Sequence, residues 1–213
     1  MNKSMADNNS EIILKIIILG SSKVGKTSII NRYFNHEFNE SMLSTIGIDF
    51  KTKYFKFDDK KLKFNYIDTA GQEKFRAISI NYMKGTNGVI LVFDITSKDS
   101  FELIKGWIDD INENAETNIG KILIGNKSDM PDSRQVDVEE AVELANGLGC
   151  EYFECSAKTG ENINEALDEI AKLSYENYQK SEKRHSIRLA SDSNNNEKAE
   201  EKEKKKGCCK SSK

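Results

Sequence analysis

Eight consecutive residues near the start of the chain have the types and the spacing needed to bind the phosphates of a nucleotide. They fit the pattern G-x-x-x-x-G-K-[ST] and read Gly20-Ser21-Ser22-Lys23-Val24-Gly25-Lys26-Thr27. We expect Lys26 to neutralise the outer phosphates and the Thr27 hydroxyl to reach a magnesium ion. The alternative is a tight turn that uses two glycines. It does not explain a lysine followed by a hydroxyl residue.

A second group of chemically suitable residues follows the apolar run Leu62–Ile67. Asp68 could hold magnesium through water, Gly71 would let the backbone approach a terminal phosphate, and Gln72 could orient an attacking water. Taken alone, the segment fits a helix N-cap at Asp68 or Thr69 equally well. Together with the first loop, it favours a nucleotide site.

Two further segments could recognise the base of the nucleotide. In Asn126-Lys127-Ser128-Asp129, the Asp129 carboxylate can accept two hydrogens from the N1 and N2 edge of guanine, whereas adenine offers no such pair. Lys127 could lay its stem across the base. The segment Ser156-Ala157-Lys158 could offer a backbone N–H to the guanine O6 atom. By itself this tripeptide reads as a solvated loop, and only its order and spacing relative to the other motifs favour base contact.

The segments that flank the first loop would give it the geometry for phosphate binding. Residues 12–19 are mainly apolar and predict a buried strand, and residues 27–34 predict the first turns of a helix. A loop between such elements directs several backbone N–H groups, and the positive end of the helix dipole, toward one point. The motif therefore lies where its chemistry requires.

Apolar patterns continue to alternate between strand and helix along the chain. Residues 48–57 and 62–67 predict an antiparallel hairpin around residues 58–61, and residues 89–93 and 122–124 predict strands covered on both faces. Apolar residues recur at helical spacing in two more stretches: Phe101, Ile104, Trp107, Ile108 and Ile111, then Ile163, Leu167, Ile170 and Leu173. This alternation predicts an α/β fold with a mostly parallel sheet and helices on both faces. Ligands of such sheets bind at the carboxyl ends of the strands, where the motifs fall.

Composition excludes several classes of protein. The chain has 213 residues, 31% of them charged, and a net charge of −3, so overall charge does not suggest a nucleic-acid partner. No apolar run approaches the roughly 20 residues that span a bilayer. Residues 1–11 are polar and do not resemble a signal peptide. The four cysteines do not suggest a secreted disulfide framework.

The character of the chain changes near residue 180. Residues 191–196 are rich in Ser and Asn, and residues 197–206 are nearly all charged. Hydrophobic residues almost vanish, so we expect a disordered C-terminal tail.

The four motifs, in this order, resemble the Ras-like small GTPases over about residues 12–178. Within that superfamily the chain is most similar to Rab proteins, on these segments: residues 45–50, residues 69–78, residues 82–85, residues 91–96 and the pair Cys208-Cys209. The resemblance implies a P-loop NTPase fold with a six-stranded sheet and a division into three parts. These are a disordered N-terminus (1–10), a GTPase domain (11–179) and a variable tail (180–213). It also implies guanine-nucleotide binding, slow GTP hydrolysis and a role in vesicle traffic.

The resemblance also assigns roles to residues. Nucleotide contacts are implied for Gly20, Ser22, Val24, Gly25, Lys26, Thr27, Ser28, Phe38, Thr45, Gly71, Asn126, Lys127, Asp129, Ser156, Ala157 and Lys158. Phe38 would pack edge-on against guanine. Magnesium would be held by Thr27, Thr45 and Asp68, and Gln72 and Lys26 would act in hydrolysis. Residues 39–47 and 70–83 would be switches whose order depends on the γ-phosphate and its magnesium. The chain shows no evident arginine finger, so an activating protein would supply one.

Partners and location follow from the same resemblance. It implies effectors, an exchange factor, a GTPase-activating protein, a GDP-dissociation inhibitor and a Rab escort protein. We expect a monomer that cycles between the cytosol and the cytoplasmic face of an intracellular membrane. Geranylgeranyl groups on Cys208 and Cys209 would anchor it, aided by the basic residues at 202 and 204–206. The alternative is an ordinary solvated lysine tail, because four glutamates dilute the positive charge.

The chain departs from the Rab pattern at two places in the folded part. Ile67 stands where Rab proteins usually have tryptophan, in a surface triad with Phe50 and Tyr82, so we expect altered partner choice with normal nucleotide binding. In the first loop, Ser21 and Lys23 stand where Asp and Gly are frequent. Lys23 is either a solvent-facing lysine, which we favour, or an added charge that tightens nucleotide retention.

Two other functions remain open at this point. One is a nucleotide-binding interaction module with negligible turnover, which the presence of Gln72, Thr45 and Gly71 argues against. The other is a signalling GTPase of the Ras or Rho kind. The tail lacks their terminal C-a-a-X box, and residues 46–50 look like Rab.

Overall fold

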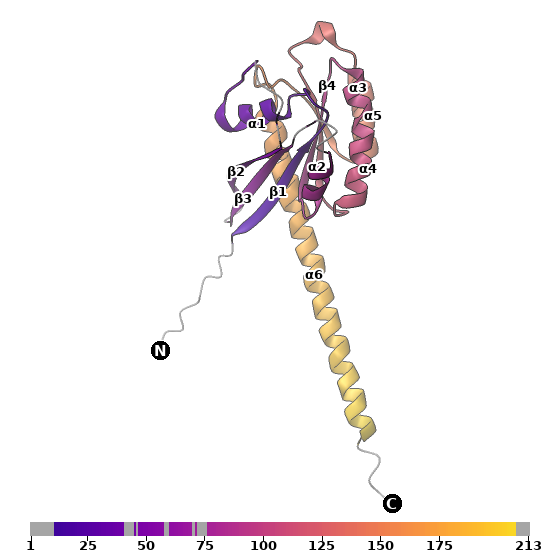
Figure 1. The fold of residues 1–213 in the computed structure, drawn as a ribbon. Coiled ribbons are helices and arrows are strands. Elements are labelled where there is room, and N and C mark those ends of the chain that lie inside the picture. The colour runs from indigo at the N-terminus through magenta and orange to yellow at the C-terminus, as the bar shows by residue number, and fades with distance from the viewer. Residues whose placement is uncertain are drawn as a thin grey trace, which may run out of the picture.

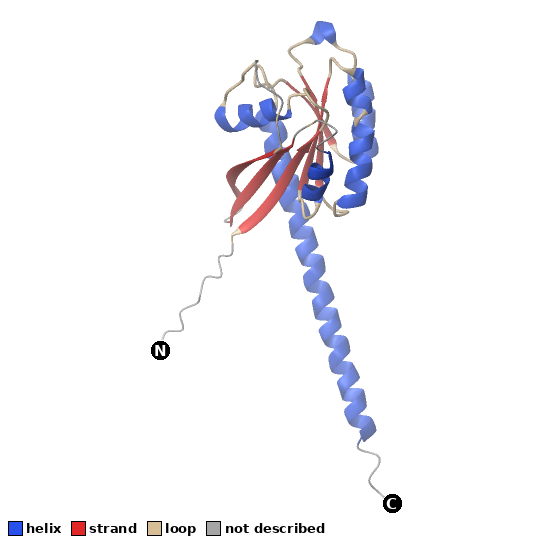
Figure 2. Cartoon of the chain, viewed as in Figure 1, coloured by secondary structure: helices blue, strands red, loops and turns tan. Residues whose placement is uncertain are grey.

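The computed structural model describes residues 11–40, 45, 47–57, 60–69, 71 and 76–207. Strands and helices alternate along the described chain as the apolar patterns predict (Figures 1 and 2). The elements are β1 (Ile12–Leu19), α1 (Lys26–Asn35), β2 (Ile48–Phe57), β3 (Lys60–Thr69), α2 (Arg76–Met83), β4 (Gly88–Asp94), α3 (Lys98–Glu102), α4 (Ile104–Asn114), β5 (Gly120–Asn126), the 3₁₀ turn η2 (Pro131–Ser133), α5 (Val138–Leu148), β6 (Glu151–Cys155) and α6 (Ile163–Gly207).

The six described strands form one sheet in the order β2-β3-β1-β4-β5-β6. All neighbouring pairs are parallel except β2 and β3, which pair antiparallel from Ile48 opposite Thr69 to Phe57 opposite Lys60. The predicted fold class and the predicted hairpin are therefore confirmed. Strand β3 extends two residues further than expected, so Asp68 and Thr69 are the last residues of a paired strand and not the first of a loop.

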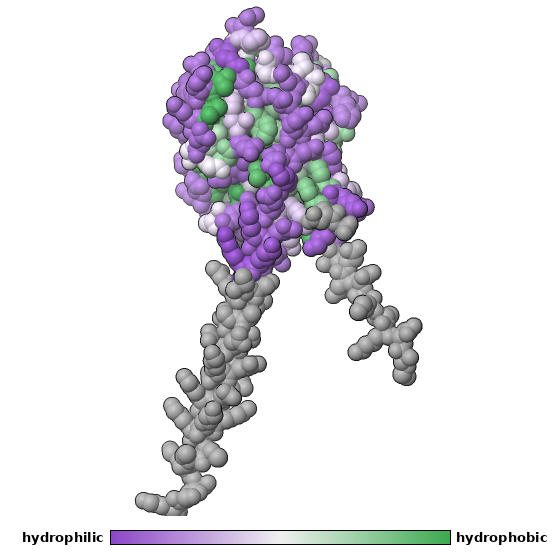
Figure 3. Space-filling model, turned by 180° about the vertical axis from the view of Figure 1, so that it is seen from behind, coloured by the Kyte–Doolittle hydropathy of each residue, from purple (hydrophilic) through white to green (hydrophobic). Residues whose placement is uncertain are grey.

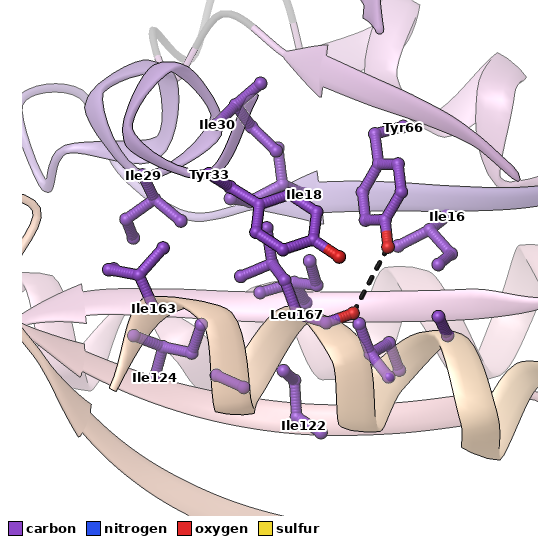
Figure 4. Packing of buried hydrophobic residues seen from close by; sticks show 14 of the residues in the cluster. Ile16, Ile18, Ile29, Ile30, Tyr33, Tyr66, Ile122, Ile124, Ile163 and Leu167 are labelled. Carbon is purple, nitrogen blue, oxygen red and sulfur yellow. Dashed lines mark hydrogen bonds between the residues drawn. The ribbon is translucent and has the colours of Figure 1, made fainter. Parts of the chain in front are cut away.

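Helices cover both faces of the sheet, as expected. Helices α1 and α6 pack on one face, and α2 to α5 lie on the other (Figure 1). Successive residues of β1 point to opposite faces, so Ile16 and Ile18 enter the core under α1 and α6. Figure 4 shows these two side chains beside Tyr66, whose hydroxyl donates to the Leu167 carbonyl at 3.1 Å. This packing fixes α1, and with it the preceding loop, against the sheet.

Helix α6 continues beyond the part that packs on the sheet. Tyr175 is buried, whereas every side chain from Lys180 to His185 is exposed. The structure extends the helix to Gly207, where the sequence predicts a tail without regular structure. The reason is local: residues 180–206 contain neither proline nor glycine and are rich in Glu and Lys, which favour helix.

The surface is mainly hydrophilic, and its apolar side chains form separate groups on the face seen in Figure 3. None of the helices in the described part of the chain combines the length and the apolar character that crossing a membrane requires.

Candidate functional site

A cleft of about 430 Å³ lies at the carboxyl ends of the parallel strands. It brings together many of the residues singled out in the sequence: Ser22, Gly25, Lys26, Thr27, Ser28, Phe38, Thr45, Gly71, Asn126, Lys127, Asp129, Ala157 and Lys158. They come from the loops after β1, β3, β5 and β6, from the first turn of α1, and from the segment between α1 and β2. The cleft is also lined by Asn39, Glu40 and Met130, to which the motifs assign no individual role.

The loop before α1 wraps around the Lys26 ammonium group. Lys26 is buried and donates to the carbonyl of Gly20 at 2.8 Å and to that of Ser21 at 2.9 Å. Glycine is needed at both ends of the loop, because a Cβ on Gly20 would lie 2.1 Å from the Val92 carbonyl oxygen. A Cβ on Gly25 would lie 2.2 Å from the Asn126 amide nitrogen. The loop therefore holds the Lys26 ammonium group beside the space in which a phosphate group would bind.

Lys23 has a backbone conformation that glycine adopts more easily, and glycine is the residue that is frequent at this position in Rab proteins. Its φ of 67° lies in the left-handed region, which L-residues other than Asn and Asp rarely adopt. The side chain is exposed at the rim of the cleft.

A buried carboxylate and two hydroxyls lie beside the Lys26 ammonium group. The hydroxyls of Thr27 and Thr45 share a hydrogen bond at 2.5 Å. Asp68 is almost fully buried, and its Oδ1 atom has no hydrogen-bond partner. Burial raises the pKa of this carboxyl, while the Thr27 hydroxyl and the Lys26 charge lower it. A buried acid with an unpaired oxygen next to two hydroxyls fits a divalent cation, which would favour the ionised form.

Other acidic ligands for such an ion are few. No group of three or more His, Cys, Asp or Glu side chains suited to a metal lies among the residues that the structure describes. A magnesium ion at Asp68 would therefore use hydroxyl, water and phosphate oxygens, which is the way this ion is usually held beside a nucleotide. The backbone of Gly71 approaches this site closely. Any larger residue would clash, since a Cβ at this position would lie 2.2 Å from the Lys26 Nζ atom.

Asn126 joins three of the predicted segments. Its amide nitrogen donates to the Val24 carbonyl at 2.8 Å, and its Oδ1 atom accepts from the Ala157 N–H at 3.1 Å. Buried Ser156 donates to the Asp129 carboxylate at 2.5 Å. Gly20, Val24, Asp68 and Ser156 thus lie behind the lining and hold the residues that form it.

Lys127 is held by the carboxylate of Asp94, to which the sequence assigned no individual role. Its ammonium group pairs with Asp94 at the end of β4, and Lys127 has a left-handed φ of 72°. The other oxygen of Asp94 accepts from the N–H and the hydroxyl of Thr96. The sequence singled out residues 91–96 at this strand end, but the contact of Asp94 with Lys127 depends on the pairing of β4 with β5.

One ion pair crosses the mouth of the cleft. The Lys158 ammonium group donates to Glu40 at 2.9 Å, and both side chains are exposed. Phe38, two residues before Glu40, lines the same side of the cleft.

Several predicted residues lie outside the described part of the chain. They are Gln72, the switch residues 41–44, 46, 70 and 73–75, the turn residues Asp58 and Asp59, and the cysteines Cys208 and Cys209.

The predicted surface triad has a different form in the structure. Phe50 and Tyr82 are in contact, with ring centroids 5.7 Å apart, and Phe50 is about half exposed. Ile67 is 1% exposed, so the expectation that it forms part of the surface is wrong. Ile67 belongs to the core cluster on the face of the sheet that α2 to α5 cover, and it lies opposite Phe50 in the β2–β3 pairing.

Comparisons with known proteins agree with this arrangement. The model of the Ras family matches residues 15–176. The chain is 44% identical over 160 residues to Ras-related protein Rab-13 of Canis lupus familiaris, covering 75% of this chain and 79% of the relative. It is 43% identical over 162 residues to Ras-related protein Rab-8B of Homo sapiens, covering 76% and 78%. It is 40% identical over 168 residues to GTP-binding protein ypt2 of Schizosaccharomyces pombe, covering 79% and 84%.

Proposed function

The chain belongs to the Ras family of small GTPases, with Rab proteins among its relatives, and from this premise we propose how its own residues carry out the work of a Rab-type switch. As a Rab-type GTPase it hydrolyses GTP and acts in vesicle traffic. Its partners are a guanine nucleotide together with effector and regulator proteins. The individual residues, the ion and the membrane anchor are our assignments.

The observation that carries these assignments is the meeting of three different binding elements in one cleft. These are the phosphate loop around Lys26, the unpaired buried oxygen of Asp68, and the acidic Asp129 in the lining of the cleft. Phosphate, cation and base sites in this order match the parts of a guanine nucleotide. We therefore assign the phosphates to the loop, magnesium to Thr27, Thr45 and Asp68, and guanine to Asp129, Asn126 and Phe38.

The proposed mechanism depends on positioning. Lys26 and the loop N–H groups hold the phosphates in line, and Gln72 orients the attacking water. Magnesium, when bound, offsets charge on the phosphate oxygens. Thr45 would hold the ion only while a γ-phosphate is present, so loss of that phosphate would release Thr45. Hydrolysis stays slow until an activating protein contributes an arginine, which is worth about 10³–10⁵ in rate.

Single-turnover GTP hydrolysis tests the catalytic assignment. We expect Gln72→Leu to lower the rate by about tenfold or more, because the water loses its orienting group. Gln135→Leu is the matched control, since Gln135 is exposed and does not line the cleft. Equal and negligible rates for the wild type and Gln72→Leu would instead favour a nucleotide-binding interaction module.

We also propose that Cys208 and Cys209 carry geranylgeranyl groups and attach the protein to the cytoplasmic face of an intracellular membrane. The support is the resemblance to Rab tails and the lysines at 202 and 204–206, because a lipid combined with basic charge makes a stable anchor. Mass spectrometry of protein from its native cells checks this. Unmodified cysteines, with unchanged localisation after removal of the last six residues, would contradict it.

A further inference from the structure

One arginine joins two segments of the chain that lead into the lining of the cleft. Arg32 lies in the last turn of α1, and its guanidinium group donates to three backbone carbonyls. The Nε atom donates to the Ala157 oxygen at 2.9 Å, Nη2 to the Lys158 oxygen at 2.5 Å, and Nη1 to the His36 oxygen at 2.8 Å. Arg32 and Ala157 are 125 residues apart in the chain.

The two segments bound by Arg32 are those that would enclose the base. Ala157 and Lys158 line the cleft and follow Ser156, whose hydroxyl donates to the Asp129 carboxylate at 2.5 Å. His36 ends α1 with a left-handed φ of 58°, and its N–H donates to the Arg32 carbonyl at 3.0 Å. Two residues later, Phe38 also lines the cleft.

The chemistry of the side chain suits this task. A guanidinium group is planar and carries five donors in a fixed arrangement, so it can bind carbonyls of two segments at once and set their separation. The arginine stem also lies close to the loop that follows Lys158. A Cβ added at Gly160 would lie 3.6 Å from the Arg32 Cδ atom. A lysine would offer a single charged nitrogen in place of the three that Arg32 uses here.

Resting on the proposed function, we propose that Arg32 is a positioning residue for guanine. It does not line the cleft itself. It holds residues 156–158 and the segment from His36 to Phe38 at the separation that a guanine base fills. Through Ser156 it also keeps the Asp129 carboxylate at the base edge. Arg32 therefore contributes to slow nucleotide release and to discrimination between bases.

Release rates of two nucleotides test this role. GDP carries the 2-amino group that Asp129 would bind, and inosine diphosphate lacks it. For Arg32→Met loaded with each nucleotide, we expect GDP release to be about tenfold faster than in the wild type, because several charge-assisted hydrogen bonds are lost. We expect a smaller acceleration for inosine diphosphate, so the preference for GDP falls. Arg32→Lys is expected to lie between the wild type and Arg32→Met.

Arg134→Met is the matched control. Arg134 also makes three hydrogen bonds, two to Glu154 and one to the Val136 carbonyl, and does not line the cleft. Its variant should leave the ratio of the two release rates unchanged. Equal acceleration of both nucleotides in Arg32→Met would show a merely structural role and overturn the proposal. A wild-type protein that binds neither nucleotide would instead refute the proposed function itself, so the two failures are distinguishable.

Discussion

At the scale of single residues, Lys23 has a backbone conformation that costs an L-residue about 1–2 kcal/mol. Lys23→Gly should therefore raise the free energy of unfolding of the GDP-bound protein by about 1 kcal/mol, measured by chemical denaturation. Lys23→Ala is the control, since it removes the charge and keeps the strained conformation, and it should give no such gain.

The same variant decides between the two interpretations of the lysine. We expect the GDP release rate of Lys23→Gly to equal that of the wild type, because the exposed side chain points into solvent at the rim of the cleft. Faster release in both Lys23→Gly and Lys23→Ala would show that the positive charge retains the nucleotide.

The burial of Ile67 leads to a separate prediction about packing. Because Ile67 is buried in the core on the face that α2 to α5 cover, Ile67→Trp must displace neighbouring core side chains. We expect it to lower the free energy of unfolding by about 1–3 kcal/mol. GTP affinity should not change, since Ile67 does not line the cleft. A stable variant with unchanged core packing, or a large loss of GTP affinity, would contradict this.

At the scale of elements, a polar network joins α1, β2, β3 and α6 below the cleft. The Tyr33 hydroxyl donates to Asp168, and the Lys53 ammonium group lies 3.5 Å from the centre of the Tyr33 ring and 3.8 Å from the Asp168 carboxylate. The Tyr33 and Tyr66 rings are in tilted contact in the same core (Figure 4). The network therefore attaches α1, which carries Arg32 and follows the phosphate loop, to the last helix.

This network predicts a pH dependence of stability. Burial, the neighbouring Tyr66 and the bond to Asp168 all raise the pKa of Tyr33 above its ordinary value. Because the folded state favours the neutral phenol, its contribution is fully present below the unfolded pKa of about 10 and is lost as pH rises above it.

The free energy of unfolding of the wild type and Tyr33→Phe should therefore differ by a constant amount up to about pH 9, and the wild type should lose this advantage above about pH 10. Urea denaturation of both proteins between pH 7 and pH 11 measures it. A difference that does not change across this range would refute the assignment.

At the scale of the whole molecule, the nucleotide cleft lies at the strand ends, and α6 leads away from the sheet (Figure 1). Side chains are exposed from Lys180 to His185, so this part of the helix adds no core. Deleting residues 186–213 should change the free energy of unfolding by less than about 0.5 kcal/mol, with unchanged GTP hydrolysis.

A chain that ends before Ser174 is the control for that deletion. It loses two buried residues, Ser174 and Tyr175, and the contact of Tyr175 with Phe57, whose ring centroids are 5.3 Å apart. It should unfold at a clearly lower denaturant concentration. Equal loss of stability in both deletions would mean that the exposed end of α6 supports the fold.

The sequence alone determined the features that depend on neighbours in the chain. Hydrophobic alternation predicted the order of strands and helices and the hairpin, and the spacing of glycines, Lys26 and Thr27 predicted the phosphate loop. Linear motifs also led to the family, which the comparisons then showed. Such signals work because a strand, a helix or a tight loop is decided within a few residues.

Only the tertiary structure decided which residues meet across long separations. Nothing in the spacing of Arg32 and Ala157 indicates that they touch, and nothing around Ile67 shows that the packing of one face of the sheet buries it. These relations depend on how the sheet is ordered and which helix packs on which face. A side chain in one element therefore acquires its role from residues that lie far away in the chain, 125 residues away in the case of Arg32 and Ala157.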